Sequence, residues 1–368
     1  MASQSSQRNL NFREQEINYI LTKLHAGDSC SVVGVGSVGK SNLLRHLLRP
    51  DVRQYHLSGE GALLNLILVD PNNMLDSLPL GMDRDSSSWA GYEIMVHRLY
   101  KTFHPFDRLD DEGKKSFLYA YRQLHAGDNP LLPYIGLRYL ELALEQVLTP
   151  DTNLRIVFVF DEFEEMLEQL PTKFFQTLRG LRDDYKYRLM YLTFTRRPIK
   201  QIVQSSDRYD WVRLEAFVEL FTDSTFFLGP YSETDGAAML DRLSARQNAS
   251  YSPSFRRFLL WSTGCFAGLL RAAFQLAGDI PFGTAEEQAL QFLANSPAIR
   301  AECQTIWESL TDAERTTLLQ HVRQQGAPAP NPEAVRLLQE KQLLTSRGTL
   351  EIAPPLFQLY VQRQAVAE

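Results

Sequence analysis

The sequence predicts an α/β protein whose N-terminal part is built on a parallel β-sheet. Short, nearly uninterrupted apolar runs alternate with amphipathic helical patterns over residues 12–230. Continuous apolar strands are typical of parallel sheets, because helices cover both faces of such a sheet. A length of 368 residues, at roughly 150 residues per domain, predicts two or three domains. The expected strands span residues 30–34, 64–70, 155–161, 188–195 and 225–228.

Composition indicates a folded protein and argues against several other classes. Hydrophobic residues make up 44% of the chain and charged residues 22%, which is typical neither of a disordered nor of a collagen-like protein. Lys and Arg number 38 against 44 Asp and Glu, which gives a formal net charge of -6. A protein dominated by nucleic-acid binding is therefore not expected, although a local basic site is compatible with this charge.

Cysteine usage and the N-terminus predict a cytoplasmic protein. The three cysteines, Cys30, Cys265 and Cys303, are far apart and lack C-x-x-C spacing, so neither a disulfide framework nor a zinc site is expected. The first ten residues have no apolar core of a signal peptide, and no run of about 18 apolar residues occurs in the sequence. Insertion into a membrane is therefore not expected.

Three blocks are expected along the chain, at residues 1–230, 231–295 and 296–368. The middle block reads as wholly helical. The last block begins with two helical stretches, continues into a short hairpin and ends in an amphipathic helix, an order that resembles a winged helix. Helix starts in the middle block are predicted at Ser232, at Ser252-Pro253 and at Gly283-Thr284. The helical stretches of the last block span 306–324 and 332–344, and its hairpin spans 345–354.

Two further features stand between the expected elements. The pentapeptide LHAGD occurs at residues 24–28 and 124–128, each time after a helical pattern and with Gly at the expected C-terminal cap. We interpret it as repeated helix-end chemistry. Residues 70–88 form a long polar connection, for which a surface insertion is favoured over a partner-contacting loop.

A complete phosphate-binding motif, G-x-x-x-x-G-K-[ST], lies between an apolar strand and an amphipathic helix. Its glycines let the backbone fold around a phosphate, so that successive N–H groups and the helix N-terminus face the anion. Lys40 would reach the terminal phosphates, and Ser41 would supply a hydroxyl to Mg²⁺. The predicted nucleotide-contacting residues are Gly34, Val35, Gly36, Ser37, Val38, Gly39, Lys40, Ser41 and Asn42.

A second strand, at residues 155–160, runs directly into two acids. Asp161 at its C-terminal tip would hold Mg²⁺, and Glu162 would act on the attacking water as general base. Glu164 and Glu165 follow, and we interpret them as the solvated start of a helix.

With both motifs present, the chain resembles the additional-strand P-loop ATPases, and more narrowly the archaeal and bacterial AAA-like and STAND branch related to origin-recognition initiators. These families carry an apolar-G-R-E-x-E motif near the adenine. Residues 11–17 (NFREQEI) align with it, with Phe12 in place of Gly, so the resemblance implies adenine contacts from Phe12 and Arg13. It also implies ATP or ADP and Mg²⁺ as cofactors.

Two arginines are implied as nucleotide sensors by the same resemblance. Residues 193–196 (TFTR) are similar to the T-T-R ending of STAND proteins, which implies that Thr195 and Arg196 sense the γ-phosphate, with Arg197 as the alternative. Residues 263–271 (TGCFAGLLR) resemble the G-G-x-P-x-L-L-R segment of the helical lid, which implies that Arg271 faces the nucleotide. A packing role at a helix start is the alternative for that segment.

Charge in the last block favours a regulatory or protein-docking winged helix over one that reads DNA. Residues 296–368 carry seven basic and eight acidic side chains, without a basic stripe. Arg347, in the expected wing, is the one side chain that suits a groove or phosphate contact, and Trp307 and Leu310 are expected in the core. The candidate recognition helix mixes signs as a solvated helix face does, at Glu333, Arg336, Glu340 and Lys341.

The sequence thus predicts an ATP-hydrolysing switch that controls assembly with partner proteins encoded as separate chains, with nucleotide-dependent homo-oligomerisation as one form of that assembly. The alternative is a DNA-associated initiator or loader that binds duplex through the winged helix. A third reading is a scaffold that binds nucleotide without hydrolysing it.

Overall fold

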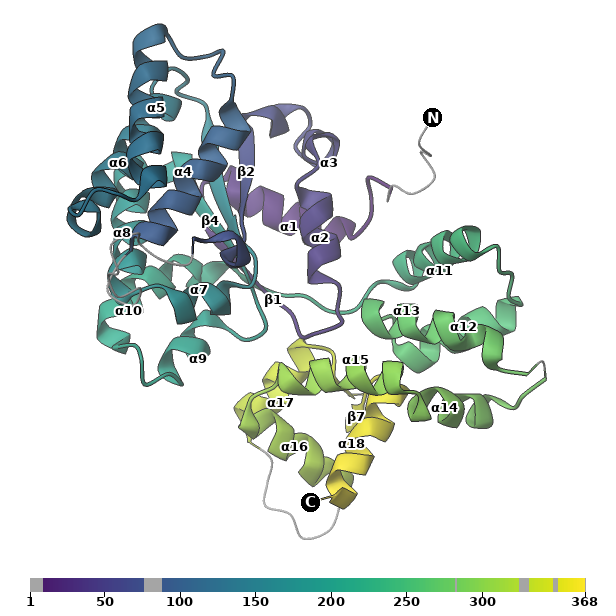
Figure 1. The fold of residues 1–368 in the computed structure, drawn as a ribbon. Helices are drawn as coiled ribbons and strands as arrows, with labels where there is room; N and C mark the ends of the chain where they lie inside the picture. Colours follow the sequence, from purple (N-terminus) through teal and green to yellow (C-terminus); the bar gives the residue numbers. More distant parts are fainter. Residues whose placement is uncertain (1–8, 76–87, 282, 324–330, 347–349, 368) are drawn as a thin grey trace. The chain divides into compact units, whose positions relative to one another are not determined.

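The computed structural model describes residues 9–75, 88–281, 283–323, 331–346 and 350–367 (Figure 1). Most of the predicted polar connection at 70–88, and Arg347 of the expected wing, lie outside the described residues. The chain divides into two compact units. The first, here called the loop unit, comprises Met1–Glu16, Gly34–His46 and Phe227–Glu368; the second, the sheet unit, comprises Ile17–Val33 and Leu47–Phe226. The three-block division at residues 230 and 295 stays a prediction.

The sheet unit is built on five strands in the order β2-β3-β4-β1-β5. The neighbouring pairs β2/β3, β3/β4 and β4/β1 are parallel, and β4 separates the strand before the phosphate motif from the acid-tipped strand. This confirms the predicted additional-strand sheet and all five strands to within a residue or two. The strands are β1 (Cys30–Val33), β2 (Leu64–Val69), β3 (Arg155–Phe160), β4 (Leu189–Thr195) and β5 (Thr225–Phe227).

Register aligns the C-terminal ends of the central strands at one edge of the sheet. Val33 of β1 lies opposite Thr195 of β4, and Phe160 of β3 lies opposite Thr193. All residues of β1 and β4 are buried, because helices cover them as the continuous apolar pattern predicts. The residues that follow these strands, including Asp161 and Arg196, therefore emerge at a common edge.

Nine α-helices lie wholly or mostly in the described residues of the sheet unit. Between β2 and β3 the chain forms α4, α5 and α6, which pack on one another and extend the aromatic-rich core. The sequence analysis did not assign this insertion. The helices are α1 (Glu14–His25), α3 (Pro50–His56), α4 (Trp89–Phe103), α5 (Asp111–Ala126), α6 (Leu132–Leu148), α7 (Phe163–Gln169), α8 (Thr172–Tyr185), α9 (Ile199–Gln204) and α10 (Trp211–Val218).

The loop unit contains the remaining helices and a two-stranded hairpin. Ser232 and Ser252 cap α11 and α12 as predicted, their hydroxyls accepting from the N–H groups of Asp235 and Phe255. Helix α14 begins at Glu286, two residues after the predicted Thr284. The elements are α2 (Lys40–Leu47), α11 (Glu233–Gln247), α12 (Pro253–Thr263), α13 (Ala267–Leu276), α14 (Glu286–Asn295), α15 (Pro297–Glu308), α16 (Asp312–Arg323), α17 (Pro332–Glu340), β6 (Leu344–Ser346), β7 (Leu350–Ile352) and α18 (Pro355–Ala367).

One predicted helical stretch, at residues 306–324, is wrong as a continuous helix. The chain breaks after Glu308 and restarts at Asp312. Thr311 and Glu314 form a capping box, in which Glu314 accepts from the Thr311 N–H at 2.8 Å and Thr311 accepts from the Glu314 N–H at 3.3 Å. This T-x-x-E spacing is visible in the sequence and is the signal that would have located the break.

Lys341 is buried, which contradicts its predicted place on a solvated helix face. Its ammonium lies 2.5 Å from a Glu314 carboxylate oxygen, and both side chains are at most 1% exposed. The other Glu314 oxygen accepts from Thr311. The pair therefore joins the end of α17 to the start of α16, and a buried pair of this kind depends on both members being present.

We predict that Lys341→Ala lowers the free energy of unfolding by about 3–5 kcal/mol, because it leaves the Glu314 carboxylate buried and unpaired. Urea denaturation measures this loss. Arg336→Ala is the matched control, since its ion pair with Glu340 is partly exposed and is worth about 1 kcal/mol or less. Equal losses in the two variants would contradict the assignment of the Glu314–Lys341 pair as a structural element.

All three cysteines are free and buried. Burial raises the pKa of the Cys30 and Cys303 thiols to about 12 and that of Cys265 to about 11, so all three are protonated at neutral pH. Within the described part of the chain, the structure contains no helix long and apolar enough to cross a membrane.

Candidate functional site

The phosphate motif forms a tight loop directly after β1. Ser37 and Gly39 adopt left-handed backbone conformations, with φ of 62° and 100°. A Cβ on Gly39 would lie 3.1 Å from the Tyr231 hydroxyl and 3.2 Å from Ala267. Glycine at position 39 is therefore required both by the turn and by the close neighbours, as a loop that wraps a phosphate needs.

The polar side chains at the start of α2 are held by the loop and its surroundings. Lys40 donates to the Gly34 carbonyl and, at 3.3 Å, to the Val35 carbonyl. Asn42 donates to the Tyr231 hydroxyl at 2.7 Å, and Ser41 is exposed. The ammonium of Lys40 is thus folded back over the loop that a phosphate would occupy.

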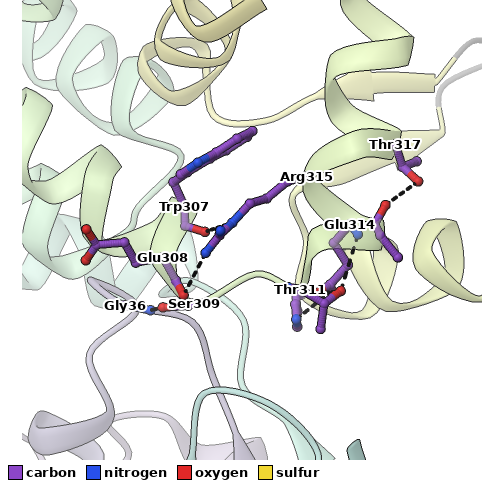
Figure 2. A network of polar contacts seen from close by, with 10 residues as sticks. Gly36, Trp307, Glu308, Ser309, Thr311, Glu314, Arg315 and Thr317 are labelled. Carbon is purple, nitrogen blue, oxygen red and sulfur yellow. Dashed lines mark hydrogen bonds and ion pairs between the residues drawn. The ribbon is translucent and has the colours of Figure 1, made fainter. Parts of the chain in front are cut away.

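Helix α15 lies against this loop and satisfies its polar groups. The Gly36 N–H donates to the Ser309 hydroxyl at 2.8 Å, and the Ser37 hydroxyl donates to a carboxylate oxygen of Glu302 (Figure 2 shows the Ser309 contact). The approach is close: a Cβ on Gly36 would lie 2.6 Å from the Thr305 carbonyl oxygen. A backbone donor that the motif assigns to phosphate, the Gly36 N–H, therefore contacts the C-terminal cap of α15, and the hydroxyl of the next residue contacts a carboxylate of α15.

The end of α15 is itself fixed in place by α16. Arg315 donates to the carbonyls of Trp307 and Glu308 at 3.0 and 3.3 Å, and its guanidinium lies over the Trp307 ring (Figure 2). The Ser309 hydroxyl also donates to the Thr305 carbonyl at 2.7 Å. The C-terminus of a helix carries partial negative charge, which complements the N–H groups of an anion-binding loop.

Helix α13 contacts the same loop from the predicted lid segment. The Gly268 N–H donates to the Ser37 carbonyl at 2.8 Å. Arg271, one turn further along, lies 3.3 Å from Glu302. Arg271 is thus brought to the loop region through Glu302, and the carboxylate that contacts Ser37 also pairs with the predicted lid arginine.

Phe12 and Arg13 lie beneath the loop. Arg13 is buried and donates to the carbonyls of Val38 and Gly229 at 2.9 and 3.0 Å, with its guanidinium 4.6 Å from the centre of the Tyr231 ring. Phe12 packs edge-on against His46 and Tyr231. Arg13 therefore supports the loop through backbone contacts, and the adenine contacts of both residues stay a prediction.

The acidic end of β3 is a separate group of residues within the sheet unit. Asp161 is half-buried and accepts from the Glu162 N–H at 3.1 Å, and Glu162 is exposed, with a backbone φ of 46°. Asn72, which follows β2, donates to the Glu162 carboxylate at 3.2 Å and also to Asp70. Carboxylate and hydroxyl oxygens are the ligands that Mg²⁺ prefers, so Asp161 fits its predicted role chemically.

The end of β4 carries the predicted sensor residues. Thr195 is fully buried, and its hydroxyl has no hydrogen-bond partner among the described residues. Arg196 is exposed, and its N–H donates to the Glu164 carboxylate. Glu164, predicted as a solvated helix start, is thus half-buried and holds the end of β4, whereas Glu165 is exposed as predicted.

Comparison with known proteins gives a similarity of fold. No protein-family model matches the sequence, and no curated protein sequence matches it. A Walker-type ATPase of Pyrococcus abyssi is similar over 97% of this chain and 99% of its own, at 15% identity and a TM-score of 0.50. The chain therefore has the fold of a Walker-type ATPase.

Two further solved structures are similar at lower TM-scores. Cdc6p of Pyrobaculum aerophilum covers 100% of this chain, and the chain covers 97% of it, at 14% identity and a TM-score of 0.40. The Orc1 protein of Aeropyrum pernix, solved in complex with DNA, shows 12% identity over 97% of this chain and 92% of its own, with a TM-score of 0.41.

In this Walker-type fold the loop unit brings together Phe12, Arg13, the phosphate loop and Arg271, and the sheet edge carries Asp161, Glu162, Thr195 and Arg196. Sequence reasoning missed Glu302, Ser309 and Asn72. None of the three belongs to a motif, because each acts through its position in the fold. The capping box at Thr311 was the available signal that a helix ends near Ser309.

Proposed function

We propose that this protein is an ATP-dependent switch in which helix α15 must leave the phosphate loop before ATP binds. One observation carries the proposal: Ser309 accepts from the Gly36 N–H, a loop donor that the motif assigns to phosphate, and Glu302 accepts from the neighbouring Ser37 hydroxyl. Because ATP and α15 would use the same donors, the two compete. Nucleotide binding would then shift an equilibrium between a closed state, in which α15 contacts the loop, and an open state, in which α15 has left it.

The chemistry proposed for the open state is in-line attack of water on the γ-phosphate. Glu162 would orient and deprotonate the water, and Lys40 and one of the arginines, Arg196 or Arg271, would stabilise the developing negative charge. The unpaired buried hydroxyl of Thr195 supports a γ-phosphate contact at the end of β4. When bound, Mg²⁺ would neutralise charge on the phosphate oxygens, held by Ser41 and Asp161.

The proposed output of the switch is assembly with partner proteins, including nucleotide-dependent association of this chain with itself. Release of α15 would expose the side of that helix that now lies against Gly36, which is buried. The DNA-loading alternative stays a prediction from the sequence, since no contact within the described residues favours it.

Replacing the loop lysine tests nucleotide binding. We expect Lys40→Ala to weaken ATP binding by about 10- to 150-fold, which corresponds to the roughly 1.5–3 kcal/mol of a hydrogen bond to a charged group. Titration with a fluorescent ATP analogue measures the change. Lys173→Ala, an exposed lysine on α8, is the control and should bind as the wild type does. Unaltered binding by Lys40→Ala would exclude the loop as the nucleotide site.

Replacing the candidate base tests hydrolysis separately from binding. Glu162→Gln should retain ATP while turnover falls by about 100-fold or more, because the amide cannot accept a proton from water. A phosphate-release assay under saturating ATP measures turnover. Glu165→Gln, three residues further along in α7 and exposed, should keep wild-type turnover. If Glu162→Gln hydrolyses ATP at the normal rate, Glu162 is not the base.

Weakening the α15 contact tests the competition itself. Glu302→Ala removes the contacts to Ser37 and Arg271 and should tighten apparent ATP binding by about 5- to 150-fold, as expected when a closed state loses roughly 1–3 kcal/mol. Isothermal titration calorimetry measures this affinity. Glu308→Ala removes an equal charge from the same helix, where that side chain accepts from Gln304 at 2.7 Å, and should leave the affinity unchanged.

Ser309→Ala weakens the contact between α15 and the loop in a second, independent way, since it removes the acceptor of the Gly36 N–H. Both variants should also raise the ATPase rate at subsaturating ATP. Unchanged or weaker ATP binding in both Glu302→Ala and Ser309→Ala would show that α15 does not compete with nucleotide, and would leave the Lys40 and Glu162 results to decide the ATPase function by themselves.

A further inference from the structure

A cluster of metal-ligand side chains lies far from the nucleotide motifs in the sequence, in the insertion between β2 and β3. Glu93 and His97 are one turn apart on α4, and Tyr121 and His125 are one turn apart on α5. Residues four apart lie on the same face of a helix, and α4 and α5 pack against each other. The two pairs therefore face one another across the helix interface.

The three potential ligands are close together. One ligand atom from each of Glu93, His97 and His125 lies within 4.8 Å of the other two. The His125 Nδ1 lies 2.8 Å from a Glu93 carboxylate oxygen, and the two imidazole rings are stacked 5.9 Å apart at 14°. Tetrahedral zinc holds its ligand atoms about 3.3 Å apart, so side-chain shifts of about an ångström would close the cluster around an ion.

A neighbouring tyrosine, Tyr121, contacts one of the two histidines in a way that suits a metal ligand. The Tyr121 hydroxyl lies 3.1 Å from the His97 Nδ1. A hydrogen bond at one ring nitrogen fixes the orientation and leaves the other nitrogen for an ion, as in many metal sites.

The carboxylate of Glu93 gives a second reason to expect an ion. Glu93 is 3% exposed, although its partner His125 is half-exposed and carries charge only when protonated. A buried carboxylate is costly unless positive charge lies close to it, and a bound cation would supply such a charge directly. The exposed ring of His125 provides a route from solvent to the cluster.

The first copy of the LHAGD pentapeptide, at residues 24–28, shows the surroundings of the equivalent histidine, His25, where no second histidine lies nearby in the described residues. His25 lies 3.0 Å from Glu60, with side chains 38% and 67% exposed. No second histidine joins this pair in the described part of the chain, and the pair is not buried. The two copies thus share helix-end chemistry, while only the second lies in a three-ligand cluster.

We propose that Glu93, His97 and His125 bind a divalent transition-metal ion of the zinc class. Two imidazoles and one carboxylate are a common ligand set for Zn²⁺, and three protein ligands leave a position for water. Because both histidines and Glu93 span α4 and α5, the ion would join the two helices and stabilise the insertion. This proposal is independent of the nucleotide function.

The test uses the full-length protein, stripped with chelator and kept without nucleotide, and titrated with ZnCl₂ against a chromophoric zinc indicator in excess Mg²⁺. We expect one equivalent of Zn²⁺ to bind to the wild type. His97→Gln and His125→Gln should each weaken binding at least about tenfold. Substitution with Co²⁺ should give a visible absorption spectrum in the wild type that both variants lose.

His25→Gln is the matched control, since it changes the same residue in the other pentapeptide and should bind Zn²⁺ as the wild type does. Far-UV circular dichroism of each variant confirms that it is folded, and Glu93→Gln, which keeps the shape of the side chain, serves if a histidine variant is not. Failure of the wild type to take up Zn²⁺, or equal uptake by folded His97→Gln, His125→Gln and His25→Gln, would overturn the proposal.

Discussion

A loop that is built to hold a phosphate presents backbone N–H groups that need an acceptor whether or not a phosphate is bound. Leaving such a group buried and unpaired costs about 1–3 kcal/mol. Here Ser309 supplies the acceptor for Gly36, and Glu302 accepts from Ser37. This requirement ties the loop to α15, and through Arg315 and the Ser309 turn it ties α15 to α16. The C-terminal helices are therefore linked to the nucleotide motif by the loop's own hydrogen-bonding need.

The same rule governs the other buried charges of the loop unit. Arg13 places its buried guanidinium on two backbone carbonyls and a tyrosine ring, and the Glu16 carboxylate, 2.7 Å away, supplies its countercharge. Lys341 and Glu314 neutralise one another between α16 and α17. Each of these side chains joins segments that are far apart in the sequence. Removal of one member of a buried ion pair would leave its partner buried without a countercharge, so a single substitution in such a pair destabilises the fold.

An element could be predicted from the sequence where residues close together in the chain determine it. The strands were found because each is a short apolar run in a sheet buried on both faces, and the loop was found because phosphate chemistry constrains consecutive residues. Lys341 was misplaced because its exposure depends on Glu314, 27 residues earlier, and no local pattern carries that information. The break between α15 and α16 could have been predicted, because the T-x-x-E spacing of the capping box at Thr311 is visible in consecutive residues.

By itself the sequence determined the α/β class, the five strands, the phosphate loop and the acid pair at the end of β3, because each follows from the chemistry of neighbouring residues. Tertiary structure decided what contacts those groups: Ser309 and Glu302 on the loop, Asn72 beside Glu162, and the meeting of Glu93, His97 and His125. Apart from Glu93 and His97, which lie four residues apart on α4, these contacts join residues separated by 28 to 273 positions, and packing alone brings such residues together.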